Sequence, residues 1–172
     1  MKRMLSISGA TLVLLWSLPC RAEDFVFEVA EPRFRVTLPN IPRMKMDPHP
    51  MNASQPHLRL LGSEGPYTVA VFVPAAAAGM TARECASAIV RSLAARPGVP
   101  PPDQIYKARL NDHTYVAIYA SRFGDVVNLH AHFMSAAGGK HCIEVHAAKV
   151  SVSEDDLDPW LNGFGNANVE AY

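Results

Sequence analysis

Residues 104–150 read QIYKARLNDHTYVAIYASRFGDVVNLHAHFMSAAGGKHCIEVHAAKV and determine most of the fold. Four segments rich in β-branched and aromatic residues occupy residues 104–110, 114–122, 126–135 and 141–150. The turn sequences between them are Asn111-Asp112, Gly124-Asp125 and Gly138-Gly139. Tight turns of this kind join antiparallel neighbours. The stretch therefore predicts an antiparallel meander of four strands.

The residues upstream add further strands. In residues 34–38, Phe34, Val36 and Leu38 alternate with polar residues, which indicates a half-buried strand, and residues 25–29 have similar content. Residues 58–61 and 67–73 resume the pattern around Gly62-Ser63-Glu64-Gly65, a predicted hairpin turn. We expect an antiparallel sheet of about six to eight strands.

One long helix is predicted over residues 81–95. Thr81 and Glu84 have the spacing of a capping box, in which each side chain binds the other's free backbone N–H. Cys85, Ile89 and Leu93 then form an apolar stripe at helical spacing. A short C-terminal helix is expected near Asp158-Pro159, packed through Trp160, Leu161 and Phe164. Helices segregated from an antiparallel sheet define the α+β class.

The N-terminus predicts export. Lys2 and Arg3 precede an uncharged apolar segment, and Cys20-Arg21-Ala22 forms a small-x-small cleavage site, so residues 1–22 read as a signal peptide. Residues 23–172 are expected to form a single domain without a membrane span, located in the periplasm. They carry 13 basic and 16 acidic residues, which argues against a nucleic-acid partner.

Two cysteines remain after cleavage of the signal peptide. Cys85 lies on the predicted helix and Cys142 on a predicted strand. An even number of cysteines in an oxidising compartment favours a disulfide, which would fix the helix on the sheet. The alternative is a pair of buried free thiols.

Four histidines and a glutamate occupy the last two predicted strands: His130, His132, His141, Glu144 and His146. If Gly138-Gly139 is a two-residue turn, His132 lies opposite Val145, and the pair His130 and His132 takes the opposite face from Glu144 and His146. This commoner turn is the one we expect, with His130 and His132 on the solvent side. A register shifted by one residue would instead assemble His130, His132, Glu144 and His146 into a candidate metal site.

Other chemistry is weakly indicated. No serine lies in a Gly-x-Ser-x-Gly elbow, and Cys142 points away from its neighbour His141, since adjacent strand residues face opposite sides. The proline-rich residues 40–55 read as a long irregular loop with exposed Met44, Met46 and Met51. We interpret this loop as flexible, with contact to a partner as the alternative. The sequence predicts no cofactor.

Phe34-Arg35-Val36-Thr37-Leu38-Pro39, followed by Pro42, resembles the F-x-V-x-L-P entry motif of small exported PsbP-like domains. The later order of a capped helix, a meander and a C-terminal helix with Trp160 and Phe164 is similar too. The resemblance implies a sheet with helices packed on it and an accessory or binding role, and it brings no catalytic motif.

The sequence therefore favours a non-enzymatic, exported protein whose partner is another protein. An immunity protein that neutralises a toxic enzyme in the envelope is one concrete form. The alternative is a metal-binding or hydrolytic envelope protein built on His130, His132, Glu144 and His146.

Overall fold

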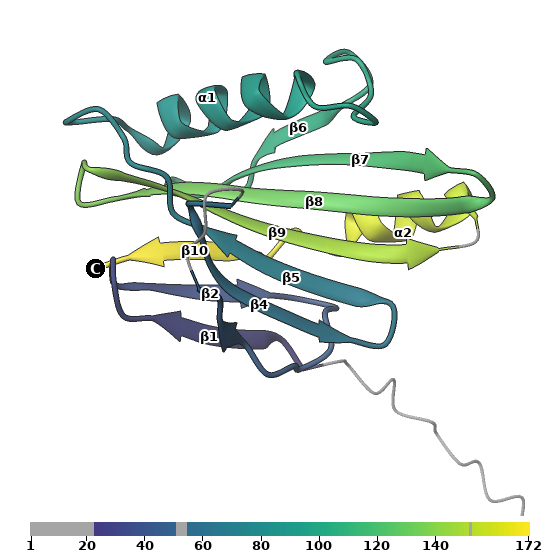
Figure 1. Cartoon of the computed structure of the whole chain (residues 1–172), viewed down its shortest axis with the longest axis horizontal. Helices are drawn as coiled ribbons and strands as arrows, with labels where there is room; N and C mark the ends of the chain where they lie inside the picture. The colour runs from purple at the N-terminus through teal and green to yellow at the C-terminus, as the bar shows by residue number, and fades with distance from the viewer. Residues whose placement is uncertain (1–22, 51–54, 152) are drawn as a thin grey trace, which may run out of the picture.

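The computed structural model describes residues 23–50, 55–151 and 153–172, so the expected signal peptide lies outside the described residues. These residues form two antiparallel sheets, one main helix and a short C-terminal helix, which confirms the α+β class. The prediction of a single sheet was incomplete, because the first two strands separate from the others and pair with a strand at the C-terminus. Figure 1 shows the main helix along one side of the larger sheet and the smaller sheet on the other side.

The larger sheet has seven strands in the order β3-β4-β5-β9-β8-β7-β6. Its strands are β3 (Asp47–Pro48), β4 (Leu58–Glu64), β5 (Tyr67–Phe72), β6 (Tyr106–Arg109), β7 (Tyr115–Phe123), β8 (Val126–Ala137) and β9 (His141–Ser151). The predicted four-stranded meander is therefore confirmed as β6 to β9. The short β3 belongs to the segment that the sequence predicted as an irregular loop.

The smaller sheet has the order β1-β2-β10 and comprises β1 (Phe25–Val29), β2 (Phe34–Leu38) and β10 (Asn168–Ala171). The sequence did not predict β10, whose four residues are too few to show a clear alternation. The main core lies between the two sheets: Phe34, Val36 and Val169 pack with inward residues of the larger sheet such as Leu129 and Phe133.

The long segment before β4 also departs from prediction. Met44 and Met46, expected to be exposed, are half-buried against the main core, while Met51 lies outside the described residues. Gly62, expected in a turn, is buried within β4. A Cβ atom at Gly62 would lie 2.6 Å from the backbone oxygen of Lys45, so only glycine permits this close approach. The turn instead falls at Gly65-Pro66, since Glu64 pairs with Tyr67.

Helix α1 (Ala82–Ala94) has the predicted cap and the predicted buried stripe. The backbone N–H of Thr81 donates to Glu84 Oε2 at 2.8 Å, and the backbone N–H of Glu84 donates to Thr81 Oγ1 at 3.3 Å. Cys85, Ile89 and Leu93 are buried against the outer face of the larger sheet, where α1 packs chiefly on β7, β8 and β9.

We expect Thr81→Ala to lower the free energy of unfolding by about 1 kcal/mol, because it removes the oxygen that accepts the Glu84 N–H. Urea denaturation measures this change. Ser87→Ala is the matched control, since Ser87 lies in the exposed middle of α1 and its hydroxyl only donates back to the Arg83 carbonyl. Equal losses for both variants would show that the cap contributes nothing.

Helix α2 (Leu157–Asn162) follows a single turn of 3-10 helix (Glu154–Asp156). The sequence predicted Pro159 in the first helical position, whereas the helix begins two residues earlier and Pro159 occupies its third position. This position is tolerated because the first backbone N–H groups of a helix have no partner within the helix. Trp160 and the following Phe164 are buried in the main core, as predicted.

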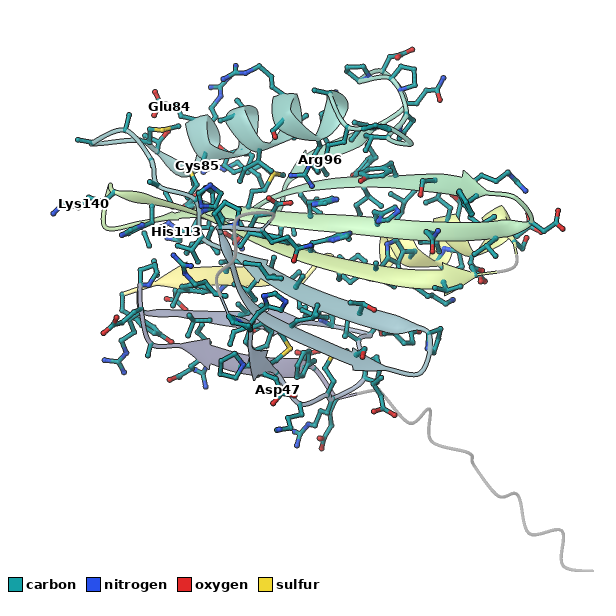
Figure 2. All side chains as sticks on the ribbon, viewed as in Figure 1. Asp47, Glu84, Cys85, Arg96, His113 and Lys140 are labelled. Carbon is teal, nitrogen blue, oxygen red and sulfur yellow. A yellow bond between two sulfur atoms is a disulfide. The ribbon has the colours of Figure 1, made fainter. Side chains whose placement is uncertain are left out.

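Cys85 and Cys142 form a disulfide, as predicted, and it joins α1 to β9. Figure 2 shows Cys85 on the side of α1 that faces the sheet. Disulfides are typical of proteins that fold in oxidising compartments, in agreement with the predicted export. Neither α-helix of the described residues is long and apolar enough to cross a bilayer.

Candidate functional site

The hairpin between β8 and β9 does not have the expected register. Ala137 pairs with His141 rather than with Lys140, so the connection contains three residues, Gly138, Gly139 and Lys140. His132 therefore lies directly opposite His146. The prediction of a two-residue turn was therefore wrong. The register shifted by one residue brings His130, His132, Glu144 and His146 to one face of the sheet.

Contacts outside the hairpin explain this register. The segment between β5 and α1 runs past the turn, where the backbone N–H of Ala76 donates to Lys140 O at 2.9 Å and that of Gly79 donates to Gly139 O at 2.8 Å. Both turn glycines have positive φ, at 56° for Gly138 and 62° for Gly139. The turn is thus shaped by a neighbouring segment as well as by its own sequence.

The face that carries the histidines is the one on which α1 packs. His132 is only 1% exposed and Glu144 5%, while His130 and His146 are half-buried. The expectation that His130 and His132 lie on the solvent side was therefore wrong. Leu129, Ala131 and Phe133 alternate with these histidines along β8 and lie in the main core on the other face of the sheet.

Two hydrogen-bonded chains organise the cluster. In the first, His132 contacts Glu144 Oε1 through Nδ1 at 2.8 Å and the Tyr119 hydroxyl through Nε2 at 3.3 Å. An ionised Glu144 accepts the proton of His132 Nδ1, which leaves Nε2 as the acceptor for Tyr119. Burial raises the pKa of Tyr119 to about 12, so this phenol stays protonated and is not an activated nucleophile.

The second chain runs from Ser121 through His130 to His146. Ser121 Oγ lies 2.8 Å from His130 Nε2, and His130 Nδ1 lies 3.0 Å from His146 Nε2. The rings of His132 and His146 stack with centroids 4.2 Å apart and planes 2° apart, so the two chains touch. Ser121 and Tyr119 were not predicted as members of the cluster, although strand alternation places both on its face.

Burial dominates the titration of the cluster. It lowers the pKa of His130 to about 4 and that of His132 to about 3, where the charges of His130 and Arg96 act in the same direction. Burial also lowers the pKa of His146 and raises that of Glu144, the latter against the opposing charge of Arg96. Figure 2 shows Arg96 at the C-terminal end of α1, on the side toward the sheet. All three imidazoles are neutral near pH 7.

Other side chains that could carry chemistry, namely Cys142 and Asp156 near α2, form structural bonds instead. The sulfur of Cys142 is oxidised, so it offers no thiolate for His141 to activate. Glu154, Asp155, Asp156 and Asp158 form an acidic stretch around the start of α2. Asp156 accepts hydrogen bonds from Ser151 and from Lys149, the latter at 3.2 Å. These contacts hold the chain that leads into α2.

A second feature is a groove between α1 and the edge strand β6, with a volume of about 450 Å³. Its lining residues are Arg83, Ala86, Ser87, Val90, Arg91, Lys107, Ala108, Arg109, Tyr115, Val116 and Met134. Four of these are cations, and none is an acid. The remaining lining is mostly apolar, with Met134 buried at its floor. The sequence reasoning did not predict this groove, because its cations come from segments far apart in the chain.

The cations of the groove differ in their partners. Arg109 forms an ion pair with Asp112, and Lys107 Nζ donates to the backbone oxygen of Pro102 at 2.6 Å. Arg83 and Arg91 have no carboxylate within ion-pair distance among the residues that the structure describes. The groove therefore has an excess of positive charge on a chain whose residues 23–172 are acidic overall.

Comparison with known proteins gives no match: no protein family matches the chain, and no curated protein is significantly similar to it. The resemblance to PsbP-like domains stays a prediction.

Proposed function

We propose that this protein is an exported, non-enzymatic binding protein of the periplasm, and that it holds an acidic segment of a partner protein in the groove between α1 and β6. The observation that carries the proposal is the groove lined by four cations and no acid. Carboxylates of a partner would pair with Arg83 and Arg91, which form no ion pair within residues 23–50, 55–151 and 153–172 as the structure describes them. The apolar floor would receive a neighbouring apolar side chain.

The position of the groove supports the same function. β6 is an edge strand of the larger sheet, so its outer side is not paired with another strand of that sheet. Extended segments commonly bind next to such an edge, where backbone groups add to the side-chain contacts. An acidic segment laid along β6 would meet Lys107 and Arg109 from the strand and Arg83 and Arg91 from the helix.

A non-enzymatic role agrees with the state of the reactive groups. Cys142 is held in a disulfide, Tyr119 stays protonated, and His132 is almost completely buried. An immunity or inhibitor protein binds its target in this way, without chemistry of its own. The identity of the partner recovered in the experiment below decides that subclass.

We expect Arg83→Glu with Arg91→Glu to weaken partner binding about thirtyfold, from about 1 kcal/mol for each reversed ion pair. Tagged mature protein captures its partner from the envelope extract of its own host, mass spectrometry identifies it, and titration with the purified partner gives Kd. The affinity of the unmodified protein should fall as salt rises.

The matched control is Lys45→Glu with Lys140→Glu, which changes the net charge equally. Both lysines are exposed and lie outside the groove. Lys45 comes two residues before β3 in the chain, and Figure 2 shows Lys140 in the β8–β9 turn. This control should keep the partner. A groove variant that binds the same partner as tightly as the control would refute the proposal.

A further inference from the structure

The three clustered imidazoles have the composition of a transition-metal site. His130, His132 and His146 each offer one ring nitrogen, and these nitrogens lie within 4.8 Å of one another. We propose that they bind one divalent ion of the zinc and copper class. Neutral imidazole is a preferred ligand for these ions, whereas calcium and magnesium require oxygen ligands. This proposal concerns a different part of the molecule from the groove and does not depend on it.

His130 and His146 form the better prepared pair. Nδ1 of His130 and Nε2 of His146 point at each other across 3.0 Å. In a tetrahedral zinc site with bonds of about 2.0–2.1 Å, two ligand nitrogens lie about 3.3 Å apart. A small separation of the two rings would therefore let an ion replace the shared proton.

His132 supplies the third ligand. Its Nδ1 is held by Glu144, which leaves Nε2 free apart from the 3.3 Å contact with the Tyr119 hydroxyl. A carboxylate on the far nitrogen of a ligating histidine is a common arrangement in metal sites, because it fixes the tautomer and orients the ring. Glu144 is thus a positioning residue rather than a ligand.

Metal binding must change one feature of the cluster. A ring nitrogen binds an ion in the plane of its ring, but the rings of His132 and His146 are parallel and stacked. One of them must turn for both to reach the same ion. Since His132 is fixed by Glu144 and nearly inaccessible, we assign the rotation to the half-buried His146. Three histidine ligands would leave a fourth position for water or for a ligand.

The test uses the mature protein with its disulfide intact, stripped of metal by a chelator. Titration with Zn²⁺, followed by calorimetry, should show one equivalent bound, and Co²⁺ should give the intense visible absorption of a tetrahedral site. His130→Ala and His146→Ala should each weaken Zn²⁺ binding by at least a hundredfold. Glu144→Gln should weaken it by about 10–100-fold. His113→Ala, which removes an exposed histidine outside the cluster, should leave it unchanged.

Near-UV circular dichroism of the metal-free variants separates a lost ligand from a lost fold. X-ray absorption of the zinc-loaded, unmodified protein gives a second measurement that needs no substitution, and it should show about three imidazole nitrogens around the metal. The proposal is overturned if the unmodified protein binds no stoichiometric Zn²⁺ or Co²⁺. It is equally overturned if His130→Ala and His146→Ala bind as tightly as His113→Ala, or if the metal has only oxygen neighbours.

Discussion

Replacing Cys85 and Cys142 together by alanine should lower the free energy of unfolding by about 4 kcal/mol. The disulfide closes a long loop, since the two cysteines are 57 positions apart in the sequence, and so restricts the unfolded chain strongly. It also holds α1 on the outer face of the larger sheet, where Cys85 is 0% and Cys142 3% exposed. Alanine is chosen because it fills the buried positions without adding a polar group.

Urea denaturation of the oxidised protein and of the double variant measures this loss. The single variant Cys142→Ala should lose nearly as much as the double variant, because either substitution breaks the bridge. Reduction of the unmodified protein should reproduce the effect. A loss below about 1 kcal/mol for the double variant would show that packing of α1, rather than the bridge, holds the helix in place.

Acid should destabilise the metal-free protein well before most carboxylates titrate. The pKa of His130 is about 4 and that of His132 about 3 in the folded protein, against 6.5 for an unperturbed histidine. Between these values the unfolded chain binds more protons, so stability present above pH 6.5 is lost as the pH falls. From pH 7 to pH 5 each of these two histidines should contribute a loss of about 2 kcal/mol.

Three neighbouring groups, His146, Glu144 and Arg96, change how steeply the free energy of unfolding falls as the pH falls. His146, whose pKa is also lowered by burial, adds to the loss. Glu144 opposes it, since its raised pKa lets the folded state bind a proton more readily. Arg96 carries a constant positive charge that disfavours protonation of His132 and His146.

Urea denaturation at a series of pH values in the presence of a chelator measures the effect. His130→Gln is the informative variant, because an amide can keep hydrogen bonds to Ser121 and His146 but does not titrate. It should reduce the slope of stability against pH between pH 5 and pH 7 by about 0.7 of a proton on average. An unchanged slope in this variant would show that His130 protonates in the folded state as readily as in the unfolded chain.

Much of the fold follows from local sequence. Phe34, Val36 and Leu38 alternate as a strand must, and the capping pair Thr81 and Glu84 marks the start of α1. These elements were predictable because their signal lies within a few adjacent residues. The prediction of the Cys85–Cys142 bridge succeeded for a related reason, since a helix that buries its apolar stripe on a sheet brings its cysteine to that sheet.

The elements that sequence reasoning missed depend on distant contacts. The register of β8 and β9 is fixed partly by Ala76 and Gly79, which bind the turn from outside the hairpin. This register decides whether the histidines form a cluster. The sequence could therefore indicate the clustered site as one of two alternatives, but it could not show which of the two registers the hairpin adopts. β10 gains its partner only because β2 lies beside it, and the groove cations come together only when β6 approaches α1.

The central position of β2 in the smaller sheet affects the order in which the molecule can fold. β2 pairs with β1 next to it in sequence, but its other neighbour, β10, is formed by some of the last residues of the chain: Val36 lies opposite Val169. Pairings between such distant segments form late, because the intervening chain must first be brought together. A polypeptide that emerges from a membrane with its N-terminus first would therefore acquire its final shape only after its C-terminal residues are free.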